Sequence, residues 1–223
     1  DTWRIIHGID EDFRPAEHGT TTLSDLLAMT DELIAKFSAF SGVIMESMTR
    51  TQAFHFLELG RRLERSLQII SLVKNCFIPM PEFPGPIFGT VLEVADSLMT
   101  YRARYLANRQ LAAVLDLVLT DETNPRALAF QFVQLVEHVE QLPRDQTSPD
   151  YAAEQRLAMS LLHSVRLMDI QAIAEVHALG DHEPLERLTA EWESQLPKLA
   201  EAISHRYLVH AAPSHQLADI SPQ

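Results

Sequence analysis

The sequence has little cysteine and little glycine: one cysteine, Cys76, and seven glycines among 223 residues. A lone cysteine excludes an intrachain disulfide and any multi-cysteine metal site, and it suits a reducing compartment. The chain also lacks a Gly-rich phosphate loop and a Gly-x-Ser-x-Gly elbow, which argues against an autonomous nucleotide site or a serine hydrolase. No apolar run is long enough to cross a bilayer, so we expect a soluble, cytoplasmic protein without a membrane partner.

Positive charge is also scarce, with 18 Lys and Arg against 31 Asp and Glu, for a net charge of -13. A phosphate backbone would be repelled, so we expect no nucleic-acid partner. None of the ten histidines has a Glu three residues before it, as di-iron helix bundles require. The groups His177, Asp181, His182 and Glu201 with His205 fit a solvated surface or a helix end better than a metal site. We therefore expect no metal and no other cofactor.

Helical periodicity is the strongest pattern present, and no segment alternates with the period of a strand. It is clearest over Thr51–Asn75, where apolar residues recur every three or four positions: Phe54, Leu57, Leu63, Leu67, Ile70 and Val73. With 46% hydrophobic residues there is ample material for a core. The sequence predicts an all-α protein, a single helical bundle of about six to eight helices over residues 1–223.

Start and stop signals place the remaining elements. A helix end followed by an acidic loop is expected over Asp1–Phe13, and a rigid connector that packs over the core is expected at Ile78–Phe88, which contains four prolines. Further helices are expected at Leu23–Glu46, Thr90–Leu106, Leu111–Leu119, from Pro125 onward, Ser148–Leu179 and Pro184–Tyr207. Gly180 should close the long helix before it.

A charged motif, GRRLER at Gly60–Arg65, interrupts the apolar pattern of the central helix. Arg61 and Glu64 are three residues apart and share a face, while Arg65 lies about 100° away. A guanidinium and a carboxylate one turn apart can form a charge-assisted pair inside a helical protein. We expect Glu64 to hold Arg61, Arg65 or the Tyr101–Arg104 segment, and Gly60 to allow close approach of a neighbouring helix.

A second polar group follows in TYRARY, where Tyr101 and Tyr105 share a face and two arginines flank them. Asn124 is expected to cap a helix that begins at Pro125. The candidate cluster comprises Arg61, Glu64, Arg65, Tyr101, Arg102, Arg104, Tyr105, Asn124 and Arg126. An interhelical network in the core and a ligand site both fit these residues, and the network is favoured because structural ion pairs resemble sites in sequence.

Four motifs in order carry a family resemblance: DTWRI at Asp1–Ile5, FLELGRRLER at Phe56–Arg65, TYRARY at Thr100–Tyr105 and DETNPRALAFQ at Asp121–Gln131. Over most of its length the chain resembles the alpha-E domain family, which is all-helical and takes its name from a Glu-Arg motif. Members occur beside or fused to circularly permuted ATP-grasp proteins and transglutaminase-like proteins, which implies a role in peptide ligation or modification. The chain resembles the later part of a full member, so we expect an upstream helical segment.

Two functions of different classes are compatible with the sequence. The first is a non-catalytic interaction module that acts with an ATP-grasp or transglutaminase-like partner, and self-association as a homo-oligomer stays open. The second is a ligand-binding or catalytic domain whose Arg, Glu and Tyr cluster binds a carboxylate or an amino acid. A dry, mutually satisfied cluster would favour the first, and a cluster that opens to a solvent-connected pocket would favour the second.

Overall fold

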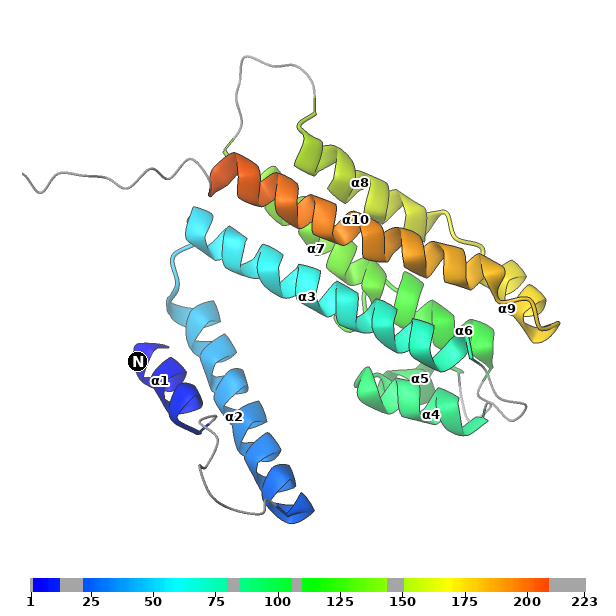
Figure 1. The fold of residues 1–223 in the computed structure, drawn as a ribbon, viewed down its shortest axis with the longest axis horizontal. Coiled ribbons are helices and arrows are strands. Elements are labelled where there is room, and N and C mark those ends of the chain that lie inside the picture. The colour runs from blue at the N-terminus through cyan, green and yellow to red at the C-terminus, as the bar shows by residue number, and fades with distance from the viewer. Residues whose placement is uncertain (1, 13–21, 80–84, 106–109, 144–150, 209–223) are drawn as a thin grey trace, which may run out of the picture. The chain divides into compact units, whose positions relative to one another are not determined.

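The computed structural model describes residues 2–12, 22–79, 85–105, 110–143 and 151–208, and all regular structure in these ranges is helical. The described ranges contain ten α-helices, labelled in Figure 1, and one π-helical turn, η1. Their bounds are α1 Thr2–Asp12, α2 Leu23–Ser47, α3 Gln52–Phe77, α4 Gly85–Val94, α5 Leu98–Tyr105, α6 Leu111–Leu115, η1 Asp116–Thr120, α7 Leu128–Glu140, α8 Ala153–Arg166, α9 Ile170–Ala178 and α10 Glu183–Tyr207. The all-α prediction is confirmed, with more helices than expected. Within these ranges no helix is both long and apolar enough to span a membrane.

The chain forms two compact units, Asp1–Phe54 and His55–Gln223. In the first unit α1 packs against α2. Helix α2 starts with a capping box, in which Thr22 N donates to Asp25 Oδ2 (2.9 Å) and Asp25 N donates to Thr22 Oγ1 (3.2 Å). This cap explains why the predicted start at Leu23 is confirmed. The acidic loop expected at the end of Asp1–Phe13 is wrong as far as residue 12, because α1 continues to that point.

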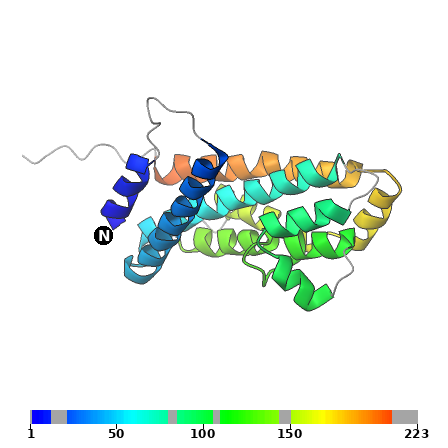
Figure 2. The ribbon, with the colours of Figure 1, turned by 90° about the horizontal axis from the view of Figure 1, so that it is seen from below.

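The second unit is built on four long helices, α3, α7, α8 and α10, which run side by side in Figures 1 and 2. Trp192 of α10 is fully buried; its ring packs edge-on against Phe132 of α7 and its Nε1 donates to Ser164 Oγ of α8 at 2.8 Å. Lys74 Nζ of α3 forms an ion pair with Glu193 Oε2 of α10 at 2.5 Å. The apolar stripes of these helices therefore meet in one core.

Two helices predicted as continuous are broken in the structure. The helix expected over Thr90–Leu106 is interrupted at Asp96, which takes a left-handed backbone conformation with φ 48° between α4 and α5. The helix expected over Ser148–Leu179 is interrupted before Asp169, whose Oδ1 accepts from Ala172 N at 3.0 Å and caps α9. Aspartate favours both turns and caps, so an aspartate lies at each break.

The proline-rich connector is shorter than predicted. Helix α4 begins at Gly85 and carries Pro86 in its first turn, where a missing N–H breaks no helical hydrogen bond. Phe88 is buried in the core, as expected for an apolar segment, and residues 80–84 lie outside the described ranges. Gly180, with φ 88°, follows the end of α9 as predicted.

Candidate functional site

The side of α3 that faces the bundle carries a buried carboxylate, Glu58, which is 2% exposed. It accepts hydrogen bonds from Arg61 Nη1 (2.8 Å) and Arg62 Nη2 (2.6 Å). Burial alone would raise the pKa of Glu58, but the hydrogen bonds and positive charges of Arg62 and Arg61 outweigh burial and lower it. The carboxylate therefore stays ionised between its two arginines at neutral pH.

Gln131 of α7 extends this network. Its Oε1 accepts from Arg62 Nη1 at 3.2 Å, and its Nε2 donates to the Pro125 carbonyl at 2.7 Å. Gln131 is completely buried, so the contacts join α3 to the start of α7 without water. Arg62 Nε is buried without a hydrogen-bond partner, the one unsatisfied position of this guanidinium. We call Glu58, Arg61, Arg62 and Gln131 the inner network.

Glu64 does not have the partners that the sequence analysis assigned to it. It is exposed, and its one interaction with the described residues is the hydrogen bond that Gln68 Nε2 donates at 3.4 Å. Glu58 lies three residues before Arg61 and four before Arg62, so a single carboxylate reaches both arginines. Six residues separate Glu58 from Glu64, which places them about 120° apart around α3. Only Glu58 faces the core.

The TYRARY segment also meets other partners than those expected. Arg104 pairs with Asp121 and donates to Thr123 Oγ1 at 3.0 Å, and the Tyr105 hydroxyl donates to Asp116 of η1. Tyr101 is 1% exposed, and its hydroxyl accepts from Gln110 N at 3.2 Å. Arg102 is exposed and forms no hydrogen bond or ion pair with the part of the chain described. The predicted contact between this segment and Glu64 is therefore wrong.

Asn124 forms hydrogen bonds that stabilise a buried turn. It does not cap α7, because α7 begins at Leu128. It is 6% exposed, and its Nδ2 donates to Ser97 Oγ (3.1 Å) and to the Leu117 carbonyl (3.0 Å). Its Oδ1 accepts from Arg126 N at 3.1 Å. These hydrogen bonds of the Asn124 side chain go to the break between α4 and α5, to η1 and to the turn that contains Asn124 itself. The capping prediction is therefore wrong, and the role of Asn124 is structural.

A groove of about 480 Å³ lies along α3 beside the inner network and shares Arg61 with it. The described residues that line it belong to α3: Phe56, Leu57, Gly60, Arg61, Glu64, Arg65 and Gln68. A second hollow of about 150 Å³ continues from Arg65 and Gln68 to Val94 and Arg126. A Cβ placed on Gly60 would meet no atom within 4 Å, so among the described residues of the second unit no helix makes the expected close approach at this glycine. We call the two hollows together the outer groove.

Arg65 lies where the two hollows of the outer groove join. It is half-buried, yet it forms no hydrogen bond or ion pair with any residue described. Burial lowers its pKa, the charges of Arg126, Arg62 and Arg61 lower it further, and only Glu58 opposes them. An arginine nevertheless stays protonated at neutral pH. Arg65 is thus an uncompensated positive charge in a chain whose net charge is -13.

Family comparison now gives this motif its context. A model described as a predicted alpha-helical domain with a conserved ER motif matches residues 1–208. The chain belongs to the Alpha-E family. Glu64 and Arg65 form the Glu-Arg pair of GRRLER, and both lie on the outer groove of this Alpha-E domain. Of the site residues proposed from the sequence, four therefore line the outer groove, Arg61, Glu64, Arg65 and Arg126, and the other five lie elsewhere in the fold.

The relatives of the domain are longer proteins. An uncharacterised protein of Mycobacterium bovis and uncharacterised proteins of two Mycobacterium tuberculosis strains are 25% identical to it over 210 residues. The alignment covers 92% of this chain and 23% of each relative, so the chain spans about a quarter of the length of these proteins. No solved structure matches the chain.

Two other side chains that could react, those of Cys76 and His177, are partly or fully buried. Burial raises the pKa of the Cys76 thiol, which makes it a poor nucleophile. His177 is 3% exposed, its Nε2 lies 2.8 Å from the Phe77 carbonyl, and burial lowers its pKa. Within the described ranges, no three His, Cys, Asp or Glu side chains converge as metal ligands do.

Proposed function

We propose that this Alpha-E domain is a non-catalytic interaction module that binds a carboxylate of a partner protein or of its peptide substrate at Arg65. The observation that carries the proposal is the half-buried guanidinium of Arg65, which has no carboxylate partner among the described residues and lies in the outer groove. A guanidinium presents a planar fork of donors that matches a carboxylate in a bidentate pair. The missing carboxylate would come from the ligand.

The form of the outer groove supports a peptide ligand. The groove is open along α3, and Phe56 and Leu57 provide apolar surface beside Arg65. Small-molecule sites are usually enclosed and bury most of the ligand, whereas an open groove suits an extended segment with a few anchoring groups. A peptide with an acidic side chain or a free C-terminus would place its carboxylate at Arg65 and its apolar groups against the helix.

Local charge supports the same ligand. The whole chain is strongly acidic and would repel an acidic partner at long range, but four arginines gather around this part of α3: Arg61, Arg62, Arg65 and Arg126. Glu58 neutralises part of the charge of Arg61 and Arg62, and Asp96 pairs with Arg126 at 2.8 Å. Arg65 retains a full charge, so the groove gives specificity for an anionic group on an otherwise acidic surface.

The partner we propose is an ATP-grasp ligase or a transglutaminase-like protein, as the family resemblance implies. In this arrangement the chemistry of peptide ligation or modification belongs to the partner, and the Alpha-E domain holds or presents the acidic peptide. The relatives are about four times as long as the matched region, which leaves room in them for other domains.

Calorimetric titration with a peptide that ends in a free C-terminal Glu tests the site. We expect measurable binding, at least tenfold weaker for Arg65→Gln, because a charge-assisted pair is lost. Arg102→Gln is the matched control: it removes the same charge from another arginine without a partner in the described ranges, and binding should be unchanged. Equal binding to wild type and Arg65→Gln would contradict the proposal.

The alternative, a ligand-binding or catalytic domain for a free amino acid, uses the same groove. Titration with free glutamate separates the two, because a module for peptides should bind the free amino acid far more weakly than the peptide. Free glutamate that binds as tightly as the peptide, and loses its affinity in Arg65→Gln, would favour the alternative.

A further inference from the structure

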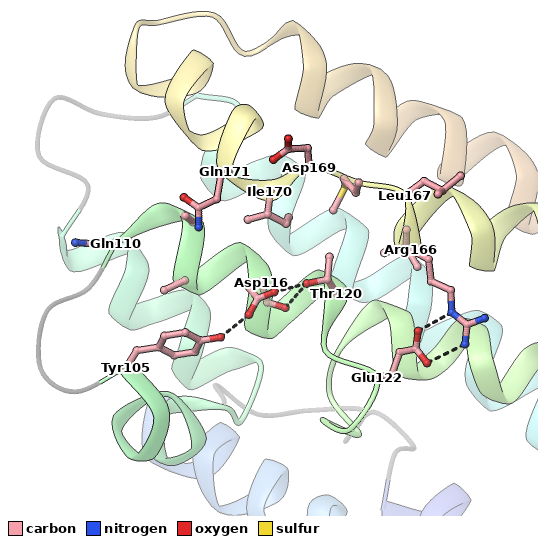
Figure 3. A pocket seen from close by; sticks show the side chains of 14 residues that line it. Tyr105, Gln110, Asp116, Thr120, Glu122, Arg166, Leu167, Asp169, Ile170 and Gln171 are labelled. Carbon is pink, nitrogen blue, oxygen red and sulfur yellow. Dashed lines mark hydrogen bonds and ion pairs between the residues drawn. The ribbon is translucent and has the colours of Figure 1, made fainter.

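A separate cavity of about 800 Å³ lies at the other end of the bundle, between η1 and the turn that joins α8 to α9. Figure 3 shows its polar wall, on which Asp116 lies between Tyr105 and Thr120, while Arg166 and Glu122 face each other at one side. The outer groove and the cavity share no lining residue. Two of the four family motifs reach this second site, through Tyr105 and Glu122.

The carboxylate of Asp116 is held on both oxygens. Its Oδ2 accepts from the Tyr105 hydroxyl, and its Oδ1 accepts from Thr120 Oγ1 at 2.5 Å. Burial and the hydrogen bond to Asp116 raise the pKa of Tyr105 to about 12, so the phenol remains a neutral donor. Both donors are uncharged, and in the part of the chain described no basic side chain lies within ion-pair distance of Asp116. A partly buried carboxylate is thus fixed in position without a counter-ion.

A π-helical turn carries two residues of this arrangement, Asp116 and Thr120. Asp121 N donates to the Asp116 carbonyl at 3.1 Å, so the turn holds one residue more than an α-helical turn. Single π-turns within helices are costly and are frequent at functional sites. Here the turn places Asp116 and Thr120 on the cavity wall, while Leu117, Val118 and Leu119 between them are fully buried.

The remaining charges of the cavity leave it acidic. Arg166 is the basic residue of the lining, and Glu122 already binds it through two hydrogen bonds of 2.6 and 2.9 Å. Asp116 and Asp169 are the other charged residues, so the lining carries three carboxylates and one guanidinium. The rest of the wall is largely aliphatic: Ala112, Ala113, Val165, Leu167, Met168 and Ile170.

We propose that this cavity binds an alkylammonium group, with the amine on Asp116 and the hydrocarbon chain against the aliphatic wall. The chemistry is that of a lysine side chain or of a free aliphatic diamine. The ammonium ion supplies the positive charge that Asp116 lacks, and its three donors suit the unused acceptor positions of the carboxylate. The cavity is large enough for a chain of four or five carbons, because ligand sites usually have about 300–1,000 Å³.

Ligand-observed NMR and calorimetry with three probes test this proposal on the whole chain: 1,5-diaminopentane, Nα-acetyl-lysine amide and 1-pentanol. We expect binding of an amine and at least tenfold weaker binding of 1-pentanol, which has a similar chain without charge. The two amines distinguish the sources, because preference for the acetylated lysine amide indicates a peptide lysine and preference for the diamine indicates a free metabolite. No saturable binding of either amine at millimolar concentration would overturn the proposal.

Two variants assign the binding to this cavity. Asp116→Asn keeps the size of the side chain and should weaken amine binding at least tenfold, while Glu191→Gln removes an exposed carboxylate that does not line the cavity and should leave it unchanged. Ala113→Leu provides a second approach if Asp116→Asn does not fold, because it fills the wall and should also abolish binding. Unchanged amine affinity in folded Asp116→Asn or Ala113→Leu would contradict the site.

Discussion

The arginines of α3 differ in their partners. Arg61 and Arg62 share the buried carboxylate of Glu58, and Gln131 completes the contact with α7. Arg65 lies seven residues after Glu58, about 20° from it around the helix, yet it lines an open groove and lacks such a partner among the described residues. The three arginines therefore project from the same side of α3, and the position along the helix axis decides which of them reaches Glu58.

The comparison separates what the motif does for the fold from what it offers to a ligand. The buried charge of the inner network is that of Glu58, which would be strongly destabilising without its arginines. Arg65 is half-buried at a groove, keeps some contact with water and tolerates the lack of a partner. The adjacent Glu-Arg pair of the family motif, Glu64 and Arg65, belongs to the second environment.

The largest expected effect on stability comes from a change in the inner network. Glu58→Ala leaves Arg61 and Arg62 without their shared carboxylate, and we expect a loss of about 3–5 kcal/mol in the free energy of unfolding, as for a buried pair broken from one side. Glu58→Gln keeps the shape and one acceptor and should cost less. Denaturant unfolding followed by circular dichroism measures both. A loss below about 1 kcal/mol for Glu58→Ala would contradict this prediction. The inner network would then contribute no more to stability than the residues of the outer groove.

Acid should weaken the same network. The folded pKa of Glu58 is lower than its ordinary value of 4.5, so the unfolded chain takes up this proton first. The stability that Glu58 contributes is present above about pH 4.5 and is lost as the pH falls through the lower folded value. We expect the difference in melting temperature between wild type and Glu58→Gln to shrink from pH 7 to pH 3. A difference independent of pH would show that the Glu58 charge does not contribute.

In the outer groove, Gly60→Ala should stabilise the protein. Alanine is favoured over glycine inside a helix by roughly 0.5–1 kcal/mol, and the added Cβ meets no atom within 4 Å. Gly180→Ala is the contrasting control, because Gly180 has φ 88° and alanine there is strained. Thermal unfolding should show a higher melting temperature for the first variant and a lower one for the second. Destabilisation by Gly60→Ala would mean that another part of the protein closes the groove at this glycine.

The sequence predicted the long, regular helices well and the breaks between them poorly. Helices α2, α3 and α10 begin and end within two residues of the expected bounds, because long apolar periodicity and capping residues mark them. The breaks at Asp96 and Asp169 were missed, because each depends on one aspartate within an otherwise helical pattern. Tertiary packing, which periodicity does not report, decides whether such a residue ends a helix.

The candidate site was predicted in its residue types but not in its pairs. Arg61 has Glu58 three residues before it and Glu64 three residues after it, so helical spacing allows both partners. Asp116 and Thr120 were missed altogether: their spacing of four residues places them on one helix face, but no sequence pattern indicates that this face lines a cavity.

The smallest expected effect on stability is that of Glu64→Ala. Glu64 is exposed, and its one hydrogen bond in the described ranges, from Gln68, is long at 3.4 Å, so the free energy of unfolding should change by no more than about 0.5 kcal/mol. Its effect on the groove should be larger than its effect on the fold. Because its negative charge lines the same groove as Arg65, its removal should strengthen binding of the Glu-terminated peptide a few fold, and Glu64→Gln should do the same. Unfolding and titration of the two variants side by side measure both effects. A loss of several kcal/mol in Glu64→Ala would show that Glu64, like Glu58, is a structural carboxylate. The distinction between the inner network and the outer groove would then fail.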